Sequence, residues 1–355
     1  MSNYPITQLL NSMSLAIVIL AAGQGSRMLS KKQKILHEVG GKPMVQHLFD
    51  TAVSLTSIPP VLIIGKGGDG VRQLFGSRAR YAVQEEQLGT GHATQMAKPL
   101  LAGAAEQVIV TYADMPLLQA PTLQKLADLQ AETGTAVTLL SVMGSPESPF
   151  GRVVRDENGR VVEILEVAQA KRRPNSAELL AISEQNAGVY CFTAGWLWDN
   201  INKLPLRQAR SGPEYYLTDL IELAVQQNRG VAAIAVDDQD ECLGAGTRAE
   251  MVAVEKAFRR RANNRWLAQG VTIVDPASTY IDPDVTIGQD TVIWPNSYLQ
   301  GQTAVGQDCI IGPNTILRNT AVGNGCRIEQ AVVEGMVLAP GTIVEPFSVM
   351  RNEKF

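Results

Sequence analysis

Up to about residue 270, the chain alternates between short, wholly apolar runs and stretches in which apolar residues recur with helical spacing. Wholly apolar runs of this kind are typical of strands that are buried on both faces of a parallel sheet. The predicted strands are 15–20, 60–65, 80–84, 107–114, 136–143, 186–192 and 231–236. The predicted helices are 43–55, 90–101, 120–133, 216–227 and 247–269. This alternation predicts an α/β fold with a Rossmann-like, mainly parallel sheet that is covered by helices on both faces.

One segment departs from this alternation of strands and helices. Residues 151–166 alternate between apolar and polar positions around the dipeptide Asn158-Gly159. Such a dipeptide is the preferred two-residue turn between antiparallel strands. We therefore expect a β-hairpin inserted near the ligand-binding edge of the sheet.

After about residue 270 the apolar positions follow a different period, and one aliphatic residue recurs every six positions. The aliphatic residues are Ile281, Ile287, Ile293, Leu299, Val305, Ile311 and Leu317. Small or β-branched residues stand four positions after each of the first six, at Val285, Thr291, Ser297, Thr303, Cys309 and Thr315. Hexapeptide repeats of this type predict a short left-handed parallel β-helix, with the aliphatic residue inside and the small residue at the corner.

After an interruption, the same pairs resume as Val322/Cys326, Leu338/Thr342 and Val344/Ser348. Three hexads make one coil, so we expect roughly three coils. A solenoid this short buries little surface alone, which predicts a homotrimer through the β-helix. The predicted organisation is a flexible N-terminus (1–13), an α/β domain (14–246), a connecting helix (247–270) and the β-helix (271–355).

Charge and cysteine content narrow the range of partners. The 355 residues carry a net charge of −4, with a pI near 5.6, which argues against general binding of nucleic acid or anionic membranes. The four cysteines form no CxxC pair, which favours a reducing cytoplasm over a disulfide framework. No apolar run reaches the roughly 18 residues that a membrane span needs. The expected partner is a small molecule.

The loop after the first strand is the strongest candidate for binding phosphate. Residues 20–34 read LAAGQGSRMLSKKQK. Gly23 and Gly25 allow a tight turn whose backbone N–H groups can approach phosphate closely. Arg27 and Lys34 add two positive charges. The alternative is a plain turn with two solvated cations, because neither GxxxxGK[ST] nor GxGxxG is present.

Two further groups of residues stand at the ends of predicted strands. Asp114 is a candidate Mg²⁺ ligand that would need phosphate oxygens as co-ligands, or else a helix N-cap. Gln84 and Gln87 carry amides that can read a base edge, and Gly89 lets the backbone approach the base, although Thr90 also suits a helix cap. Glu166 and Asn186 are candidates for contacts with sugar hydroxyls. Together these groups predict phosphoryl or nucleotidyl transfer by positioning rather than covalent catalysis.

At these motifs the chain resembles the sugar-nucleotide pyrophosphorylases. It is most similar to the uridyltransferase half of the bifunctional N-acetylglucosamine-1-phosphate uridyltransferase and glucosamine-1-phosphate acetyltransferase. The shared motifs, in order, are LAAGxGSRM, KILH, QLGTGHA, YADMPL, FGRVVR, NAG and EYYLTDLIELA. The resemblance covers essentially residues 15–350 and identifies 14–246 as a nucleotidyltransferase domain.

The resemblance implies a role for each matching residue. Leu20, Ala21, Ala22, Gly23 and Gly25 would hold the nucleotide by their backbone, together with Gln84, Gln87, Gly89 and Thr90 around the uracil. Arg27 and Lys34 would be catalytic through the phosphates, and Asp114 would bind Mg²⁺. Gly151, Glu166 and Asn186 would contact the amino sugar. The implied reaction is attack of a sugar-1-phosphate on UTP with release of pyrophosphate.

The chain also departs from the family pattern at several positions. Gln33 replaces the proline that usually precedes the loop lysine, and Gly246 replaces an asparagine that helps to bind Mg²⁺. The segment 167–169 replaces a His-Lys-Asp sequence, which is expected to alter sugar choice. No histidine follows His92, and the β-helix stops at Phe355 where that of the family continues, so no acetyl transfer is expected. Two alternatives remain: a non-catalytic nucleotide-sugar-binding regulator, and a relative that uses dTTP or GTP.

Overall fold

The computed structural model describes residues 13–209 and 212–352. Most of the predicted flexible N-terminus, residues 1–12, lies outside this described part. The chain divides into two compact units. The first takes residues up to Leu36 and Met44–Gly244, and the second takes His37–Pro43 and the residues from Ala245 onward. Among the helices of the described part, none is both long enough and apolar enough to cross a membrane.

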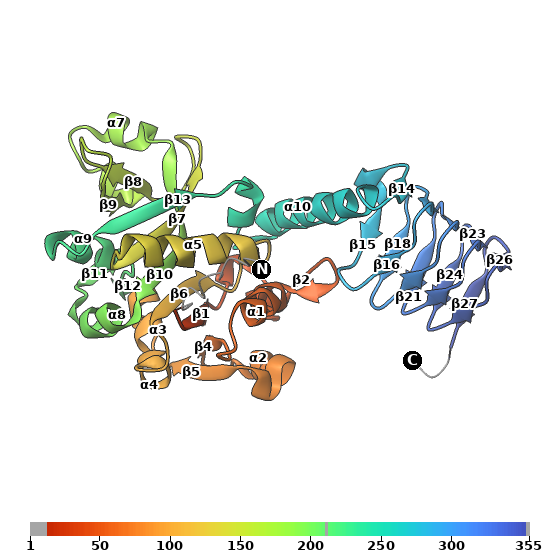
Figure 1. Cartoon of the computed structure of the whole chain (residues 1–355), viewed down its shortest axis with the longest axis horizontal. Coiled ribbons are helices and arrows are strands. Elements are labelled where there is room, and N and C mark those ends of the chain that lie inside the picture. The colour runs from red at the N-terminus through yellow and green to blue at the C-terminus, as the bar shows by residue number, and fades with distance from the viewer. Residues whose placement is uncertain (1–12, 210–211, 353–355) are drawn as a thin grey trace, which may run out of the picture. The chain divides into compact units, whose positions relative to one another are not determined.

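The first unit is built on a nine-stranded mixed sheet (Figure 1). Its main strands are β1 (Leu15–Ala21), β4 (Val61–Gly65), β5 (Arg80–Gln84), β6 (Gln107–Tyr112), β7 (Val137–Met143), β10 (Glu184–Thr193) and β13 (Val231–Ala235). They lie in the order β13-β7-β10-β6-β1-β4-β5. Only β10 runs antiparallel to its neighbours along this path, so the predicted mainly parallel sheet is confirmed.

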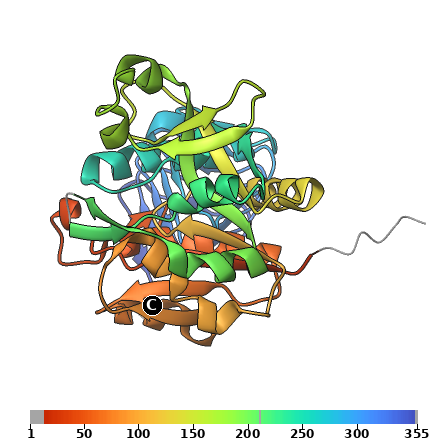
Figure 2. The same ribbon diagram turned by 90° about the vertical axis from the view of Figure 1, so that its left-hand side faces the viewer.

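Helices cover both faces of this sheet (Figure 2). Successive residues of β1 point to opposite faces, as in any strand, so Ile17 joins one buried cluster and Val18 the other. The Ile17 face is covered by α1 (Met44–Leu55), α2 (Asp69–Phe75) and α5 (Ala120–Thr133). The Val18 face is covered by α3 (Gly89–Gln95), α4 (Lys98–Leu101), α8 (Ala194–Asn200) and α9 (Asp219–Gln226). This burial on both faces is why β1 could be recognised as a wholly apolar run.

The helix predicted over 90–101 is wrong, because the structure has two short helices, α3 and α4, in its place. Pro99 lacks the N–H that would bond to the carbonyl of residue 95, so one continuous helix is interrupted there. Thr90 is also not the helix cap. Its hydroxyl instead accepts a hydrogen bond from the Leu217 N–H at 3.1 Å.

The predicted hairpin over 151–166 is confirmed as β8 (Arg152–Arg155) paired antiparallel with β9 (Val161–Leu165). Gly159 of its turn has φ +77°, a conformation that glycine adopts without strain. The short helices α6 (Val167–Ala170) and α7 (Ser176–Ala181) follow this hairpin. A second hairpin, β11 (Leu206–Ala209) with β12 (Gly212–Tyr215), was not predicted.

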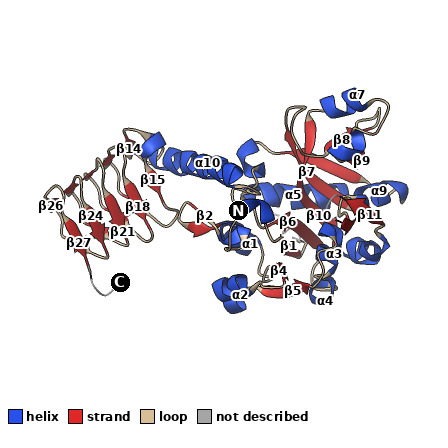
Figure 3. Cartoon of the chain, turned by 180° about the vertical axis from the view of Figure 1, so that it is seen from behind, coloured by secondary structure: helices blue, strands red, loops and turns tan. Residues whose placement is uncertain are grey.

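The second unit contains a long helix and a left-handed parallel β-helix (Figure 3). A short hairpin, β2 (Glu38–Val39) with β3 (Lys42–Pro43), also belongs to it. The long helix, α10, spans Arg248–Leu267, and the Thr247 hydroxyl caps its start by accepting from the Glu250 N–H at 3.2 Å. The β-helix has three parallel sheets of two- and three-residue strands. The first sheet consists of β14 (Thr272–Ile273), β17 (Val292–Ile293), β20 (Ile310–Ile311), β23 (Arg327–Ile328) and β26 (Ile343–Val344). The second consists of β15 (Tyr280–Ile281), β18 (Tyr298–Gln300), β21 (Ile316–Arg318), β24 (Val332–Glu334) and β27 (Val349–Arg351). The third consists of β16 (Thr286–Ile287), β19 (Ala304–Val305), β22 (Ala321–Val322) and β25 (Val337–Leu338).

The predicted inward positions of the β-helix are buried, but the predicted interruption and the coil number are wrong. Ile328 and Val333 fill the gap after Val322, and both side chains are fully buried. They were missed because some intervals between inward residues, such as Ile328 to Val333, are five residues long rather than six. Two of the sheets have five strands and the third has four, which makes between four and five coils instead of three.

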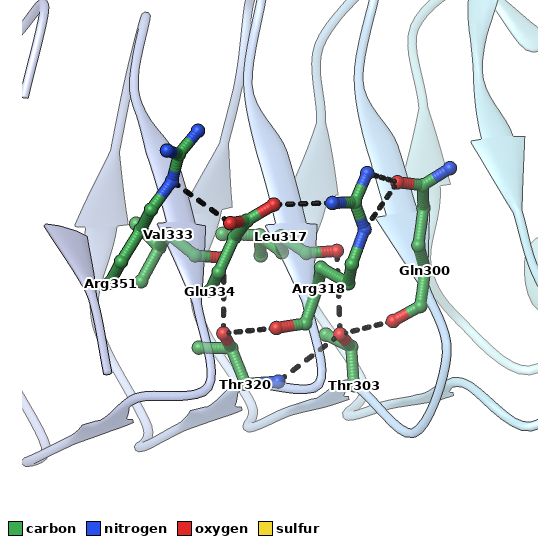
Figure 4. A network of polar contacts seen from close by, with 8 residues as sticks. All are labelled: Gln300, Thr303, Leu317, Arg318, Thr320, Val333, Glu334 and Arg351. Carbon is green, nitrogen blue, oxygen red and sulfur yellow. Dashed lines mark hydrogen bonds and ion pairs between the residues drawn. The ribbon is translucent and has the colours of Figure 1, made fainter. Parts of the chain in front are cut away.

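One outer edge of the β-helix carries a ladder of polar side chains (Figure 4). The Arg318 guanidinium donates to the Gln300 side-chain oxygen at 2.8 Å and forms an ion pair with Glu334. Arg351 in the next coil pairs with the same carboxylate at 3.0 Å. At the nearby corner, Thr320 is fully buried, and its hydroxyl donates to the Val333 carbonyl at 3.1 Å. The corner hydroxyls therefore satisfy backbone groups between coils, as their small size allows.

Candidate active site

A cavity of about 430 Å³ lies at the carboxyl ends of β1, β5 and β6, where an open α/β sheet places its ligands. The predicted residues that line it are Leu20, Ala21, Ala22, Gly23, Lys34, Gln84, Gln87, Gly89, Thr90 and Asp114. They come from segments up to 94 positions apart in sequence, yet they border one cavity. The predicted residues Gly25, Arg27, Gly151, Glu166 and Asn186 do not line it.

Lys34 and Asp114 form an ion pair inside this cavity. Both side chains are largely shielded from solvent, with exposed fractions of 15% and 22%. Gly25 has φ +68°, and a Cβ at this position would overlap the Cβ of Lys34. A glycine is therefore required here so that the loop can turn and let the lysine pass. The ion pair thus brings the predicted phosphate-binding cation and the predicted metal ligand to the same place.

Arg27 lies apart from this pair. It belongs to a short 3₁₀ helix, Ser26–Met28, and its side chain is exposed. No ion pair with Arg27 is found in the described part of the chain. Its catalytic role stays a prediction, since its side chain does not line the cavity.

The Gln84 amide fixes the loop on the opposite side of the cavity. Gln84 is buried, and its side-chain N–H₂ donates to the Gly89 carbonyl at 3.0 Å and contacts His92 Nδ1 at 3.2 Å. Gly89 has φ +91°, and a Cβ there would come within 2.7 Å of the Tyr215 carbonyl oxygen. The glycine is thus explained by the close approach of β12, in addition to any close approach of a base.

The three predicted sugar-contact residues are brought together beside the cavity. The Asn186 N–H donates to the Gly151 carbonyl at 2.8 Å, and a Cβ on Gly151 would lie 3.4 Å from a Glu166 carboxylate oxygen. Burial raises the pKa of Glu166, and the nearby Asp219 charge raises it further. Tyr112 lines the cavity, and its pKa is raised by burial and then by the charges of Asp114 and Glu166. Tyr112 is therefore close enough to both Asp114 and Glu166 to respond to their charges.

The donor set fits Mg²⁺ only if a bound phosphate supplies further ligands. Asp114 provides one hard carboxylate at the cavity, and Mg²⁺ usually takes one or two carboxylates together with substrate oxygens. Among the described residues, no group of three or more His, Cys, Asp or Glu could hold a metal. Gly246 belongs to the second unit and has no side chain to offer. Its N–H donates to the Glu250 carboxylate at 2.7 Å.

Four residues that line the cavity were not among the predicted site residues: the apolar Ile35 and Ala93, and the polar Tyr112 and Glu214. Tyr112 ends β6 two positions before Asp114, so its place at the strand end was available as a signal. Glu214 comes from β12, the hairpin strand that was not predicted. Its signal in the sequence was its place as the first residue of the shared motif EYYLTDLIELA, to which no role was assigned.

Comparisons with known proteins match both parts of the chain to described families. Residues 17–186 match the family model of the MobA-like NTP transferase domain, and residues 284–319 match that of the bacterial transferase hexapeptide (six repeats). A protein of Exiguobacterium sibiricum named bifunctional protein GlmU is 42% identical, over 95% of this chain and 73% of that protein. A protein of the same name from Pelotomaculum thermopropionicum is also 42% identical, over 96% and 73%.

A crystal structure of a putative glucose-1-phosphate thymidylyltransferase from Bacillus anthracis shares the fold, with a TM-score of 0.53 and 19% identity. The structural match covers 68% of this chain and 94% of the chain in that crystal structure. At this identity the likeness concerns the fold alone. The two relatives settle the family, because each is well above 30% identical and matches over most of its own length. The chain therefore belongs to the GlmU family of nucleotidyltransferases.

Proposed function

We propose that the chain transfers a uridylyl group from UTP to N-acetylglucosamine-1-phosphate or a closely related amino sugar-1-phosphate. The observation that carries this proposal is the Lys34–Asp114 ion pair on a cavity that is edged by the glycine-containing loop. A triphosphate with its cation supplies the opposite charge to each member of the pair. The cluster of Gly151, Glu166 and Asn186 beside the cavity offers the polar groups that an amino sugar needs.

In the proposed reaction, an oxygen of the sugar-1-phosphate attacks the α-phosphorus of UTP. The new phosphorus–oxygen bond forms as the bond to the bridging oxygen breaks, and pyrophosphate leaves with the electron pair. Lys34 and Arg27 would place positive charge where negative charge develops. The backbone of Ala21–Gly23 holds the phosphates in place. Mg²⁺ held by Asp114 would neutralise phosphate charge and act as a Lewis acid.

The deciding experiment is a matrix of UTP, dTTP and GTP against several sugar-1-phosphates in the presence of Mg²⁺, with pyrophosphate release as the readout. The proposal expects the highest rate with UTP and an N-acetylated amino sugar. A preference for dTTP or GTP would show that the chain is a relative that uses a different base. No release with any pair would contradict the enzymatic proposal.

A non-catalytic regulator remains the second candidate, because Gly246 leaves only Asp114 of the two expected metal ligands. It predicts that UDP-sugar binds in calorimetry while nothing turns over. In that case Gly246→Asn should restore pyrophosphate release. If the wild type is instead active, Gly246→Asn should lower the Mg²⁺ concentration that gives the half-maximal rate.

We further propose that residues 271–355 carry no acetyltransferase activity. That transfer needs a base to deprotonate the acceptor amine, and no histidine occurs in this stretch. An assay with acetyl-coenzyme A and glucosamine-1-phosphate should therefore show no free thiol above background.

We also propose that the chain is a homotrimer through its β-helix and works in the cytoplasm.

A further inference from the structure

Three successive carbonyl groups where β1 ends are each held by a different partner. The Leu20 carbonyl accepts at 3.0 Å from the N–H of Ala113, the residue that directly follows β6. The Ala21 carbonyl accepts from the side-chain N–H₂ of Gln33 at 3.2 Å. The Ala22 carbonyl accepts from the side-chain N–H₂ of Gln87 at 2.6 Å. The last two bonds fix the backbone at the last residue of β1 and at the residue that follows it.

Fixing a carbonyl also fixes the N–H group of the next residue. A trans peptide is planar, so its C=O and N–H groups point in opposite directions. The Gln33 bond to Ala21 therefore sets the direction of the Ala22 N–H, and the Gln87 bond to Ala22 sets that of the Gly23 N–H. In the described part of the chain, the Gly23 N–H has no hydrogen-bond partner, and the space where its Cβ would stand is open.

The oxygen of the Gln33 side-chain amide indicates that this residue does not serve mainly to stabilise the fold. Its Oε1 is buried and has no hydrogen-bond partner among the described residues. A buried acceptor without a partner is unfavourable, whereas an apolar side chain of similar size would avoid this loss. Turning the amide over would place its oxygen against the Ala21 carbonyl oxygen, so the observed orientation follows from the single bond that Gln33 makes.

We propose that Gln33 is a positioning residue for the phosphates of the nucleotide substrate, acting through the Ala21–Ala22 peptide. This inference rests on the proposed nucleotidyl transfer and adds to it a residue that does not line the cavity. With Gln87 it forms a pair of amides that turns two consecutive N–H groups toward an anion. The loop is thereby arranged before the ligand arrives, and less free energy is lost in ordering it.

The test compares Gln33→Leu and Gln33→Glu with the wild type. Leucine removes the donor and also the unpartnered oxygen, while glutamate keeps the size and puts a carboxylate oxygen against the Ala21 carbonyl. Gln124→Leu is the matched control, because Gln124 is exposed on α5 and its amide donates only to Asp128, at 2.8 Å. UTP affinity is measured by calorimetry, KM and kcat by pyrophosphate release, and folding by thermal melting.

Gln33→Leu should raise the KM and Kd for UTP about 3- to 10-fold, the range expected for one neutral hydrogen bond. Its melting temperature should equal or exceed that of the wild type. Gln33→Glu should weaken UTP at least as much, and Gln124→Leu should leave UTP binding unchanged. A purely structural role predicts the reverse pattern, with a lower melting temperature and an unchanged KM.

That reverse pattern, or unchanged UTP binding in both Gln33 variants, would overturn the inference. If Gln33→Leu does not fold, the Kd of Gln33→Glu decides the matter. The outcome is separable from that of the proposed function, which is tested on the wild type alone. A wild type that neither binds nor turns over any nucleoside triphosphate refutes the proposed function, whereas an active wild type with unaffected variants refutes only the role of Gln33.

Discussion

Single residues set the charge of the cavity, and Lys34 is the one with the largest expected effect. Lys34→Ala leaves Asp114 without its ion-pair partner and removes a cation from the site of developing negative charge. Electrostatic groups of this kind contribute about 10²- to 10³-fold to rate, so kcat/KM should fall by that factor. Steady-state pyrophosphate release measures it. Lys31→Ala removes an exposed charge from the same loop and should keep its activity. A Lys34→Ala variant with wild-type kinetics would refute the assignment.

Glu166 gives a pH-dependent prediction. Its folded pKa is raised, first by burial and then by Asp219, so the folded state binds this proton more tightly than the unfolded state does. The stability that comes from this group is therefore present below the unfolded pKa of about 4.3 and is lost as the pH rises through the folded value. A glutamine at this position cannot ionise, so Glu166→Gln avoids this loss of stability at high pH. The variant should melt at a higher temperature than the wild type at pH 7.5, and the difference should shrink at pH 4.

A constant difference between the two proteins across that pH range would show that Glu166 does not titrate in this way. The same variant should raise the KM for the sugar-1-phosphate, because it replaces a carboxylate acceptor beside Gly151. Asp156→Asn is a suitable control. Asp156 is half-buried in the same hairpin, and its pKa is lowered by hydrogen bonds from Arg160, so its contribution to stability changes with pH in the opposite direction.

The residues of the cavity were only partly predictable from the sequence. Gly23, Lys34 and Asp114 follow or end recognisable strands, so a rule about strand ends was enough to bring them together. The pairing of Lys34 with Asp114 was not predictable, because 80 positions separate them and only the tertiary fold sets their distance. The bond of Gln33 to Ala21 was not predictable either, because the path of the loop between them follows no periodic pattern.

Among the elements, the loop after β1 depends on one glycine. Gly25→Ala places a methyl group against the Lys34 side chain and requires a positive φ from alanine. Displacing a catalytic group by about 1 Å can cost about 10²-fold in rate, and kcat/KM should fall accordingly. The control is Gly103→Ala, which has a similar φ of +76° but open space at its Cβ. The positive φ should cost each variant about 1 kcal/mol of stability, the overlap with Lys34 should cost Gly25→Ala more, and only Gly25→Ala should lose activity.

The β-helix allows a matched pair of substitutions on neighbouring residues. Ile311 points inward and is fully buried, whereas Ile310 points outward and is partly exposed. Ile311→Ala should lower the free energy of unfolding of the β-helix by about 2–5 kcal/mol, and Ile310→Ala by less than about 1.5 kcal/mol. Urea denaturation followed by circular dichroism measures both. Equal losses would mean that the inward and outward positions have been assigned wrongly.

Elements with a strong period were predicted well, and those without one were missed. α5 was expected at 120–133 and is found there, because its apolar spacing and Pro121 mark it clearly. The hairpin of β11 and β12 has no alternating pattern and was not expected. In the β-helix, the coils with five-residue intervals hid Ile328 and Val333 from a strict search for period six.

For the whole molecule, the main prediction is its association state. The outer faces of the β-helix carry exposed apolar side chains such as Val349, which is 63% exposed. Association through such faces would bury them. Sedimentation equilibrium at micromolar concentration should give about three times the 38.3 kDa of one chain. A single species with the mass of one chain would contradict the trimer.

The last turns of α10 take part in the interior of the β-helix. Trp266 belongs to the same buried cluster as Ile273 and Ile281, and the Asn263 amide donates to the Pro276 carbonyl at 2.8 Å. α10 thus plugs the open end of the first coil, the role that a terminal cap plays in a solenoid. A fragment cut at residue 271 would lose this plug and expose the apolar lumen to water. Anyone who excises the repeats for separate study should therefore keep α10, and the natural cutting point lies ahead of Thr247.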